Sequence, residues 1–580
     1  MSRIAKPWMG ANLIAPGVYT FTDVSRMNAP RGAPSRAVAV IATGRGGGVG
    51  SVTPLTRATQ VPAALVSGDL AHMTRIVLDA GCSDVYAIRV NQATPAQLDL
   101  GDLVLSAANP GLIGRALQAR RVVSASRADA DDLYLRHGTT GQTEEYRGLG
   151  PSVDVTFRGA GANPQLKVVV DPTTKDVTVT LTSDAAAEIA TFTSDATKTV
   201  RDLVNAINNT GAWSAREVGD PAASTTELQP VTVVVDGGTK RGTLRTGANA
   251  ILRALLDSAL VTAAAAGGAA TRSNEYKFFG GGSEGAAPTV QDWINAFALA
   301  ESLDVIGVVV GSGDSAVVAA ARSHVYAMSS IKNRRERRAY VGPDLTSTKA
   351  AVKATAAAMV QGVGGERVIV AGNEVKDYDL TTGRLTNYPA YYLAAFAAGV
   401  KAARRPEESN TNVKVTLPGL RYVMSPEDLE ELLEAGVMPA HYDTEQQSNV
   451  ITQGITSYTR DANVILRKDS GMDVMDSLNK KIRIRLKPFV GRPGDQSTVR
   501  AIRAAVEAAL REEVRGPQNP YGMLTAGVDA QGRPMPAYRN LEAEFDGYDF
   551  TGVRYEANPV GTNEYIGVLT TFTPTRIIAA

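Results

Sequence analysis

The chain has 580 residues, of which 44% are hydrophobic and 6% aromatic, and its formal net charge is +1. A chain of this length exceeds one hydrophobic core, so we expect several domains. The near-neutral charge argues against a dedicated nucleic-acid binder. No apolar run reaches the ~18 residues of a membrane span. No apolar segment of a signal peptide follows Arg3 and Lys6, and the single Cys82 excludes an intrachain disulfide. We therefore expect a protein made in a cytoplasm and not inserted into a membrane.

Residues 1–33 are predicted to form an extended N-terminal arm, because their prolines and glycines interrupt helices. The arm contains a β-favouring run with no neighbouring hairpin partner. Such a lone strand is either part of a disordered tail or an arm that adds a strand to another subunit's sheet. The residues assigned to this inter-subunit strand are Pro16, Gly17, Val18, Tyr19 and Thr20.

Residues 34–114 are predicted to form the first part of an α/β core domain. An apolar run over 37–42 indicates a buried strand, a helix is expected over 69–80, and a second strand over 85–90.

Residues 115–275 are predicted to form an inserted β-rich domain. Short Val/Thr runs indicate strands at 153–157, 166–170, 177–181 and 231–235, with a hairpin loop over 171–176. A helix is expected over 199–208. An Ala-rich helix over 243–272 would lead back to the core.

Residues 276–440 are predicted to complete the α/β core. Strands are expected at 303–310 and 367–371, and helices at 315–330 and 347–361. Ser425-Pro426-Glu427-Asp428 predicts a helix start, with Ser as the cap, Pro at the first position and acids near the helix dipole. The helix is expected to end at Gly436.

Residues 441–580 are predicted to form a C-terminal α+β domain. Val499, Ile502, Val506, Leu510 and Val514 recur every three or four residues, which predicts an amphipathic helix that ends before Gly516-Pro517. The chain ends in a predicted second arm strand, over 565–572. Its inter-subunit residues are Tyr565, Ile566, Val568 and Leu569.

Two basic clusters are present. Residues 332–338 follow a predicted helix end and are interpreted as a solvated cap. Over 481–487, basic and apolar residues alternate, which predicts a strand with one strongly basic face. That face needs an acidic partner within the chain, on another subunit or on an inner tube. The predicted strand-accepting sheet comprises Lys481, Ile482, Arg483, Ile484, Arg485 and Leu486.

The turn Gly311-x-Gly313-x-x-Ala316 matches a dinucleotide fingerprint formally and raises the alternative of a nucleotide-dependent α/β enzyme. Its position in mid-chain and the acidic Asp314 favour a simple strand-to-helix turn. The four histidines lack metal-ligand spacing. We therefore assign no catalytic residue, cofactor site or metal site.

Several segments together resemble the contractile bacteriophage tail sheath protein family. They are residues 16–20 and 472–491 near the two ends, Ala108-Asn109-Pro110-Gly111-Leu112-Ile113-Gly114, Phe279–Gly285, Asn387-Tyr388-Pro389-Ala390 with 394–400, Glu431–Pro439, and Val450–Arg460. Their order follows that of the family outside 115–275.

The resemblance implies a structural subunit and no enzyme. Family members polymerise as stacked hexameric rings around a tail tube and contract to drive the tube through the target cell envelope. The implied partners are further copies of the chain, the tail tube protein, and baseplate and tail terminator proteins, within a virion assembled in the host cytoplasm. The inserted domain would face outward. The tube-facing helix would present Arg500, Arg503, Glu507 and Arg511. Another self-assembling shell or surface-layer protein is the remaining alternative.

Overall fold

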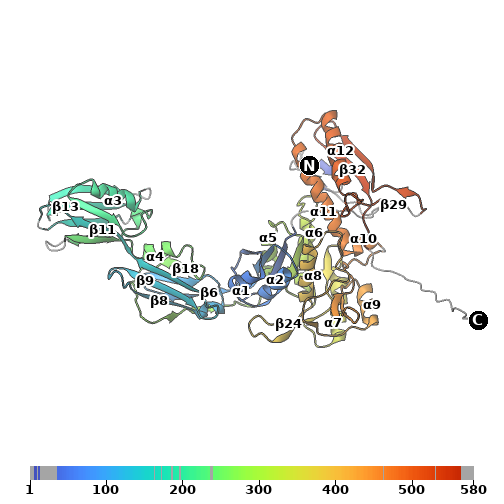
Figure 1. Cartoon of the computed structure of the whole chain (residues 1–580), viewed down its shortest axis with the longest axis horizontal. Coiled ribbons are helices and arrows are strands. Elements are labelled where there is room, and N and C mark those ends of the chain that lie inside the picture. Colours follow the sequence, from blue (N-terminus) through green and yellow to red (C-terminus); the bar gives the residue numbers. More distant parts are fainter. Residues whose placement is uncertain are drawn as a thin grey trace, which may run out of the picture. The chain divides into compact units, whose positions relative to one another are not determined.

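The computed structural model describes residues 6–8, 11–13 and 36–562, apart from 162, 172, 175, 185–186, 195–197, 235–239, 462 and 529–530. The chain divides into two compact units, one made of residues 1–91 and 287–580 and the other of 92–286 (Figure 1). The predicted multidomain α/β and α+β fold class is confirmed. Both predicted arm strands, 16–20 and 565–572, lie outside the described residues.

The first unit is built on a six-stranded sheet. Its strands follow the order β23 (Val368–Val370), β22 (Arg338–Val341), β21 (Gly307–Val310), β3 (Val38–Ala42), β5 (Val85–Arg89) and β4 (Val52–Leu55). Neighbouring strands are parallel except β4, which is antiparallel to β5. Both faces of a parallel sheet must be covered, and the continuous apolar run of β3 satisfies this requirement.

Helices cover the two faces of this sheet. Val38, Val40 and Ala42 face α1 (Val61–Leu65), α2 (Asp69–Asp79) and α8 (Tyr391–Ala403). The intervening Ala39 and Ile41 face α5 (Val290–Ala300), α6 (Ser315–Met328) and α7 (Lys349–Val363). The predictions of strands at 37–42, 85–90 and 367–371 and of helices at 69–80, 315–330 and 347–361 are confirmed within a few residues. The strand predicted over 303–310 is confined to β21.

Helix α9 (Pro426–Glu434) lies beside this core and begins as predicted. The Ser425 side chain accepts a hydrogen bond from the Asp428 amide, and Gly436 after the helix has a φ of +80°. Small antiparallel pairings complete the region. Their strands are β24 (Val375–Tyr378), β25 (Leu385–Tyr388), β26 (Gly419–Leu420), β27 (Ala440–Asp443) and β28 (Ser448–Ile451).

The C-terminal part of the first unit consists of helices and hairpins (Figure 1). The helices are α10 (Val464–Arg467), α11 (Asp469–Leu486) and α12 (Gln496–Glu512). The strands are β29 (Gly527–Val528), β30 (Pro534–Met535), β31 (Tyr538–Phe545) and β32 (Thr551–Ala557). Its core contains Leu478, Ile482, Val506, Leu510 and Leu541. The predicted amphipathic helix is confirmed as α12.

The strand predicted over 481–487 is wrong, because residues 481–486 form the last turns of helix α11. A strand would place Ile482, Ile484 and Leu486 on one buried face. In the structure Ile482 is 4% exposed, whereas Ile484 is 60% exposed. The predicted strand-accepting sheet is therefore not present at this position.

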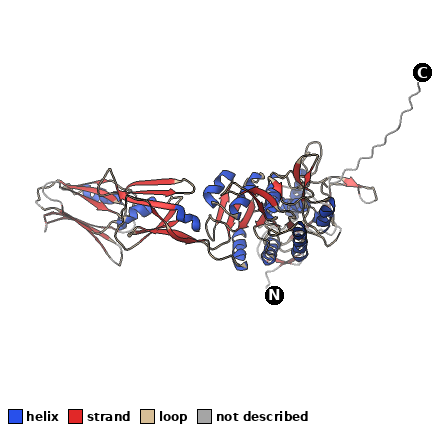
Figure 2. Cartoon of the chain, turned by 90° about the horizontal axis from the view of Figure 1, so that it is seen from below, coloured by secondary structure: helices blue, strands red, loops and turns tan. Residues whose placement is uncertain are grey.

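The second unit is rich in strands, which Figure 2 shows in red. Its first sheet has the order β18 (Val261–Ala265), β7 (Leu103–Ala107), β6 (Thr94–Asp99) and β20 (Gly280–Ser283). Its second sheet has the order β10 (Thr143–Leu149), β9 (Asp131–His137), β8 (Leu117–Val123) and β19 (Lys277–Phe278). These two sheets and α4 (Ala248–Ala254) share one core. Because β6, β7 and β20 belong to this core, the unit extends beyond 115–275 at both ends.

Two further sheets of the second unit enclose another core, which includes Phe157, Leu166 and Trp213 and is flanked by α3 (Val200–Asn208). One sheet is β15 (Trp213–Glu217), β11 (Pro151–Phe157) and β17 (Arg241–Arg245). The other is β14 (Ala187–Ser194), β13 (Val177–Asp184), β12 (Gln165–Val170) and β16 (Val231–Val234). The predicted strands and the 199–208 helix are confirmed. The helix predicted over 243–272 is mostly wrong, because Val261–Ala265 pair with β7 as a strand.

The remaining short elements are β1 (Lys6–Trp8), which pairs with β2 (Ala11–Leu13), and the 3-10 turns η1 (Ala58–Gln60), η2 (Leu112–Ala116), η3 (Thr225–Glu227) and η4 (Lys487–Phe489). Within the part of the chain that the structure describes, no helix has the length and apolarity needed to cross a bilayer.

Candidate functional site

One face of helix α11 carries a row of charged residues, which we call the charged stripe. Its members are Asp469, Asp473, Asp476, Lys480 and Arg483. Their spacings of four, three, four and three residues place them on the same side of the helix. Each one contacts the α/β part of the first unit. Helix α11 therefore joins the C-terminal part of this unit to its sheet through charged groups.

Asp473, the second member of the charged stripe, is 4% exposed. Its Oδ1 accepts a hydrogen bond from Arg338, the first residue of β22. Its Oδ2 lies 3.3 Å from Nζ of Lys401 on α8 and 3.6 Å from Nη2 of Arg36, which precedes β3. Arg338 also donates to the Asp469 carbonyl at 2.6 Å. One helical carboxylate thus binds cations from three separate elements of the α/β layer.

The two other acidic members of the charged stripe are paired as well. The Asp469 carboxylate accepts hydrogen bonds from the Ser409 hydroxyl at 2.8 Å and the Asn410 amide at 2.9 Å. Asp476 forms a bidentate pair with Arg367, with both N–O distances at 2.9 Å. Bidentate pairing fixes orientation as well as distance. The acidic half of the stripe therefore determines how α11 is rotated against the sheet.

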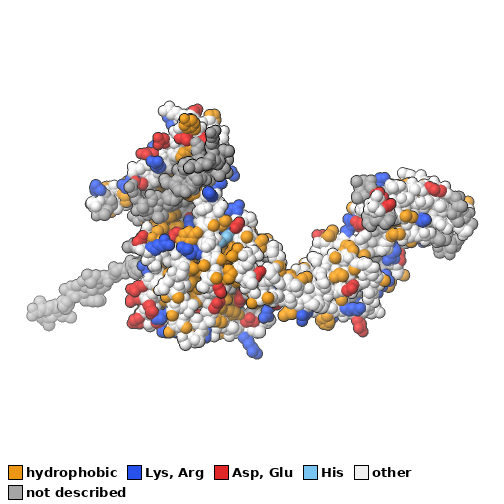
Figure 3. Space-filling model, turned by 180° about the vertical axis from the view of Figure 1, so that it is seen from behind, with side chains coloured by type: hydrophobic (Ala, Val, Ile, Leu, Met, Phe, Trp, Pro, Cys, Tyr) orange, Lys and Arg blue, Asp and Glu red, His pale blue; other side chains and the backbone are white. Residues whose placement is uncertain are grey.

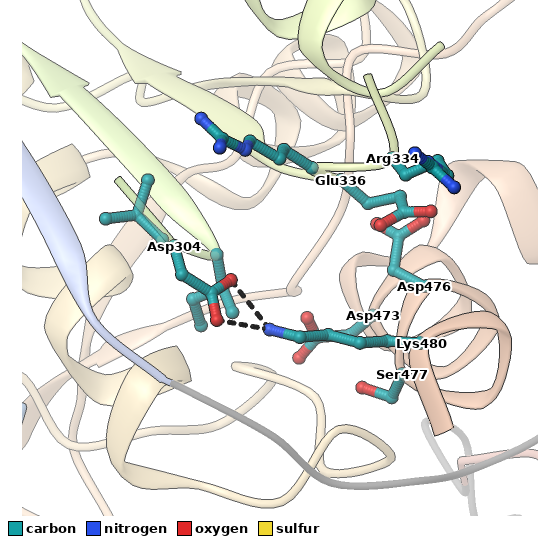
Figure 4. Close-up of a pocket in the computed structure, with 10 residues that line it drawn as sticks. Asp304, Arg334, Glu336, Asp473, Asp476, Ser477 and Lys480 are labelled. Carbon is teal, nitrogen blue, oxygen red and sulfur yellow. Dashed lines mark hydrogen bonds and ion pairs between the residues drawn. The ribbon is translucent and has the colours of Figure 1, made fainter. Parts of the chain in front are cut away.

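The basic half of the charged stripe faces acids on the α/β part. Lys480 Nζ lies 2.6 Å from both Asp304 oxygens, and Arg483 binds Glu336 in a bidentate pair at 2.5 and 2.6 Å. Figure 4 shows Lys480 pointing from α11 to Asp304, with Asp473, Asp476 and Ser477 along the same helix. The cavity between these groups has a volume of about 30 Å³, which is roughly the volume of one water molecule. This cavity is too small for a nucleotide.

Electrostatics maintain the buried carboxylate of Asp473 in its charged form. Burial raises the pKa of Asp473, but the charges of Arg338 and Lys401 outweigh burial and leave that pKa below its usual value. Burial lowers the pKa of Lys401 despite the nearby acids. Burial also keeps the pKa of Asp476 above its usual value, although Arg367 acts in the opposite direction. The pKa values of Asp473 and Asp476 are therefore shifted in opposite directions.

A buried ion network of this kind determines geometry more than it adds stability. Removing charges from water costs several kcal/mol per ion, about as much as their attraction returns. Breaking one member, however, leaves an uncompensated buried charge, which is strongly unfavourable. The charged stripe therefore favours one rotation and one register of α11 on the sheet and penalises all others.

The basic cluster at 332–338 contributes to this site, so its interpretation as a solvated cap is wrong for its last two residues. Arg337 and Arg338 are 0% and 1% exposed. Arg337 donates to the carbonyls of Ala300 and Leu303, each at 2.8 Å. The signal that identifies the site is the 4-3-4-3 spacing of charges in α11, which the search for apolar periodicity missed.

The predicted tube-facing residues lie on the exposed side of α12. Arg500, Arg503 and Arg511 are exposed. Arg511 donates to Glu507 at 2.7 Å and to the Tyr538 hydroxyl at 3.2 Å, and Arg503 donates to the Leu541 carbonyl at 3.2 Å. The helix is therefore held against β31 and still presents cations to solvent.

The glycine turn after β21 has its amide donors occupied by acids. The Asp314 carboxylate accepts from the amides of Ala316 and Val317 at 2.7 and 3.2 Å, and Asp344 accepts from the Gly313 amide at 3.0 Å. A Cβ at Gly311 would lie 2.6 Å from that of Ala42. Close packing therefore explains the glycines, and the carboxylates stand where a phosphate would need to bind.

Residues 286–457 match the phage tail sheath protein central domain. This segment contains Arg338 of β22, Arg367 just before β23 and Lys401 of α8, which all bind acids of α11. The sheath resemblance predicted from the sequence is confirmed by the match over residues 286–457.

Solved structures show the same fold. A sheath tail protein from Desulfitobacterium hafniense is 14% identical, with a TM-score of 0.52 over 94% of this chain and 100% of that chain. One from Listeria innocua is 15% identical, with a TM-score of 0.53 over 91% of this chain and 96% of that chain. The comparison with curated proteins finds no match.

Proposed function

We propose that this chain is a tail sheath subunit that polymerises as stacked hexameric rings around a tail tube. The polymer contracts and drives the tube through the envelope of a target cell. The observation that carries the proposal is the sheath central domain at 286–457, joined to α11 by the charged stripe. The subunit belongs to a virion tail and assembles in the host cytoplasm. Baseplate and tail terminator proteins bind the two ends of the polymer.

The charged stripe supports a division of labour within the sheath subunit. Buried ion pairs have short range and strict geometry, so they resist rotation of α11 against the sheet. During contraction, α11 and the α/β part then move together as one body. The large displacements occur between subunits, which is the usual behaviour of rigid domains with mobile connections.

The arms connect neighbouring sheath subunits in this proposal. Residues 16–20 and 565–569 have β-favouring sequences and donate strands to a neighbour. The acceptor is the β31–β32 hairpin, because within the described residues this sheet has only two strands and therefore two open edges. Open edges pair readily with added strands, and a two-stranded sheet gains stability from a third.

The tube contact is assigned to α12. Arg500 is exposed and makes no hydrogen bond or ion pair within the described part of the chain, whereas Arg511 is already paired with Glu507. An exposed unpaired guanidinium is suited to a bidentate contact with a carboxylate of the tube protein. Arg503 lies one turn further along the same face.

Electron microscopy of the purified protein tests the assembly. The wild type is expected to form hollow tubes with a regular axial repeat. A chain lacking residues 1–24 is expected to retain the circular dichroism spectrum and the thermal unfolding of the wild type but to form no tubes. Normal tubes from the shortened chain would contradict strand donation by the N-terminal arm.

The tube contact is tested by reversing charges. The double variant Arg500→Glu/Arg503→Glu is expected to form tube-free sheaths but to lose assembly on the tail tube. Lys487→Glu is the matched control, since Lys487 is also an exposed cation but follows α11 rather than lying on α12. Tube-dependent assembly that is unchanged in the double variant would refute the assignment.

A further inference from the structure

One sheet of the second unit carries a stack of alternating arginine and tyrosine side chains. We call it the Arg–Tyr stack, and its members in spatial order are Arg136, Tyr276, Arg120, Tyr134 and Arg147. The Tyr276 ring centre lies 3.9 Å from the guanidinium carbon of Arg136 and 5.0 Å from that of Arg120. The Tyr134 ring centre lies 4.6 Å from the guanidinium carbon of Arg120 and 5.9 Å from that of Arg147. The strand register pairs Arg120 with Tyr134, which places both on the same sheet face.

The stack leaves hydrogen-bonding capacity unused. Ring stacking covers the flat faces of a guanidinium, but its N–H groups point outward in the plane. Within the described residues Arg120 makes no hydrogen bond or ion pair, and Arg136 donates only to the Gln118 amide oxygen, at 2.7 Å. Arg147 is paired with Glu145. Two guanidinium groups, fixed in position, therefore have no carboxylate partner.

The surroundings of the Arg–Tyr stack have the composition of a protein interface. Phe278, in the next strand, is 64% exposed, and it pairs with Gln118 on the sheet. Arginine, tyrosine and phenylalanine are enriched where proteins dock. Elsewhere, as Figure 3 shows for one face of the molecule, acidic and basic side chains are interspersed. This sheet face is thus distinguished by the fixed arrangement of its arginine and tyrosine side chains and not by its net charge.

A surface of complementary chemistry lies on α9 of the first unit. Glu427, Glu430 and Glu434 are exposed and lie on one side of this helix, at spacings of three and four residues. Within the described residues none of the three forms an ion pair, since the lysines of α7 bind Asp428 and Glu431 instead. Just before the helix, Val423 is 80% exposed.

We propose that the Arg–Tyr stack of one sheath subunit docks onto the acidic face of α9 in a second copy of the chain. Arg120 and Arg136 bind the glutamates, and Phe278 covers Val423. Two different surfaces of one chain that bind each other make a head-to-tail contact, which propagates into rings or helices. The contact rests on the self-assembly proposed above, but it requires neither the arms nor a tail tube.

Charge exchange between two full-length variants tests the contact. One variant carries Arg120→Glu and Arg136→Glu, and the other carries Glu430→Lys and Glu434→Lys. Each variant alone presents like charges on both surfaces, so its self-association is expected to weaken at least tenfold. A mixture restores opposite charges between chains, so hetero-association is expected to recover and to weaken with added salt. Sedimentation velocity of the separate and mixed variants measures both effects.

The controls separate this contact from other assembly steps. Arg158→Glu reverses an exposed cation of the same unit outside the stack and is expected to leave association unchanged. Unchanged association of both charge-exchange variants would overturn the proposal. Loss in the Arg120/Arg136 variant alone, without recovery on mixing, would also overturn it and indicate a different anionic partner. Wild-type tubes together with failed mixing would refute this contact while leaving the sheath role intact.

Discussion

Helices α11 and α12 belong to the same part of the chain and have almost the same length, 18 and 17 residues, yet they are held in different ways. Helix α12 packs through Val506, Ala509 and Leu510, and its charged residues face solvent. Helix α11 shares that apolar core through Leu478 and Ile482 but buries a row of ion pairs on another side.

The difference separates stability from specificity. Apolar packing stabilises α12 roughly in proportion to the buried area and tolerates small shifts. Ion pairs return little net energy but accept only one geometry. The sheath role proposed above would use both properties, a fixed orientation of α11 against the α/β part and an exposed face of α12 for partners. The same part of the chain therefore uses both kinds of contact.

Breaking the ion pairs of Asp473 in the charged stripe is expected to have the largest effect on stability. Asp473→Ala leaves Arg338 and Lys401 buried beside an empty space, so the free energy of unfolding should fall by about 3–5 kcal/mol. Urea denaturation measures this loss, and hydrogen exchange of the α11 amides shows whether the helix detaches first.

The double variant Arg338→Met/Asp473→Leu sharpens the test at the same site. Removing both partners leaves Lys401 hydrogen-bonded to the carbonyls of Pro406 and Glu408. The double variant should therefore be more stable than Asp473→Ala. Equal destabilisation of both variants would show that packing volume, rather than charge pairing, dominates at this position.

Shortening a buried apolar side chain of α12 is expected to have the next largest effect on stability. Leu510 is 0% exposed, and Leu510→Ala should cost about 2–4 kcal/mol through lost burial and a cavity. Unlike the Asp473 variant, it should leave the exchange of the first α11 turns unchanged. Faster hydrogen exchange of the amides near Asp469 in this variant would show that the two helices unfold as one unit.

The α/β core, α12 and the sandwich strands could be predicted from the sequence because their buried positions are apolar. The periodicities of 2 and 3.6 residues then report burial directly. Helix α11 was missed because its buried positions include polar and charged residues, such as Asp469, Asp473 and Arg483, while alternating Ile and Arg near its end imitate a strand. Residues 261–265 escaped for another reason. Their alanines favour a helix, but pairing with β7 outweighs this propensity.

The candidate site was predictable only in part. Segment 472–491 attracted attention through family resemblance, but its partners Arg338, Arg367 and Lys401 are remote in sequence. No local pattern indicates that Arg337 and Arg338 are the buried arginines of the 332–338 cluster. That information arises only when β22 is placed beside the start of α11. Identifying these charge pairs, whose members are far apart in the sequence, therefore required the three-dimensional structure.

Two neighbouring arginines offer a third test, which depends on pH. Arg338 is buried beside the Asp473 carboxylate, whereas Nη1 of Arg337 lies 3.3 Å from Nε2 of the buried His324. Burial, together with the Arg337 charge, lowers the pKa of His324 from 6.5 to about 4. Because the folded-state pKa is the lower one, the neutral histidine stabilises the fold above pH 6.5, and this contribution is lost as pH falls toward 4.

The loss over that pH range should be on the order of 2–3 kcal/mol. Thermal unfolding of the wild type and of His324→Gln across the range measures it. The stability of the variant should depend less on pH than that of the wild type. Carboxylate titrations occur in both proteins and therefore do not contribute to the difference. Parallel curves for the two proteins would mean that His324 is not the titrating group.

The smallest effect is expected at the most solvent-exposed pair of the charged stripe. Lys480 and Asp304 are 24% and 62% exposed at their side chains, and exposed pairs contribute less than about 1 kcal/mol. A double-mutant cycle of Lys480→Ala and Asp304→Ala should therefore give a small coupling energy that decreases with added salt. A coupling as large as that between Arg338 and Asp473 would contradict a dependence of the coupling energy on burial. The stripe would then act as one cooperative network from Asp469 to Arg483, and the distinction between its buried pairs and its exposed pair would disappear.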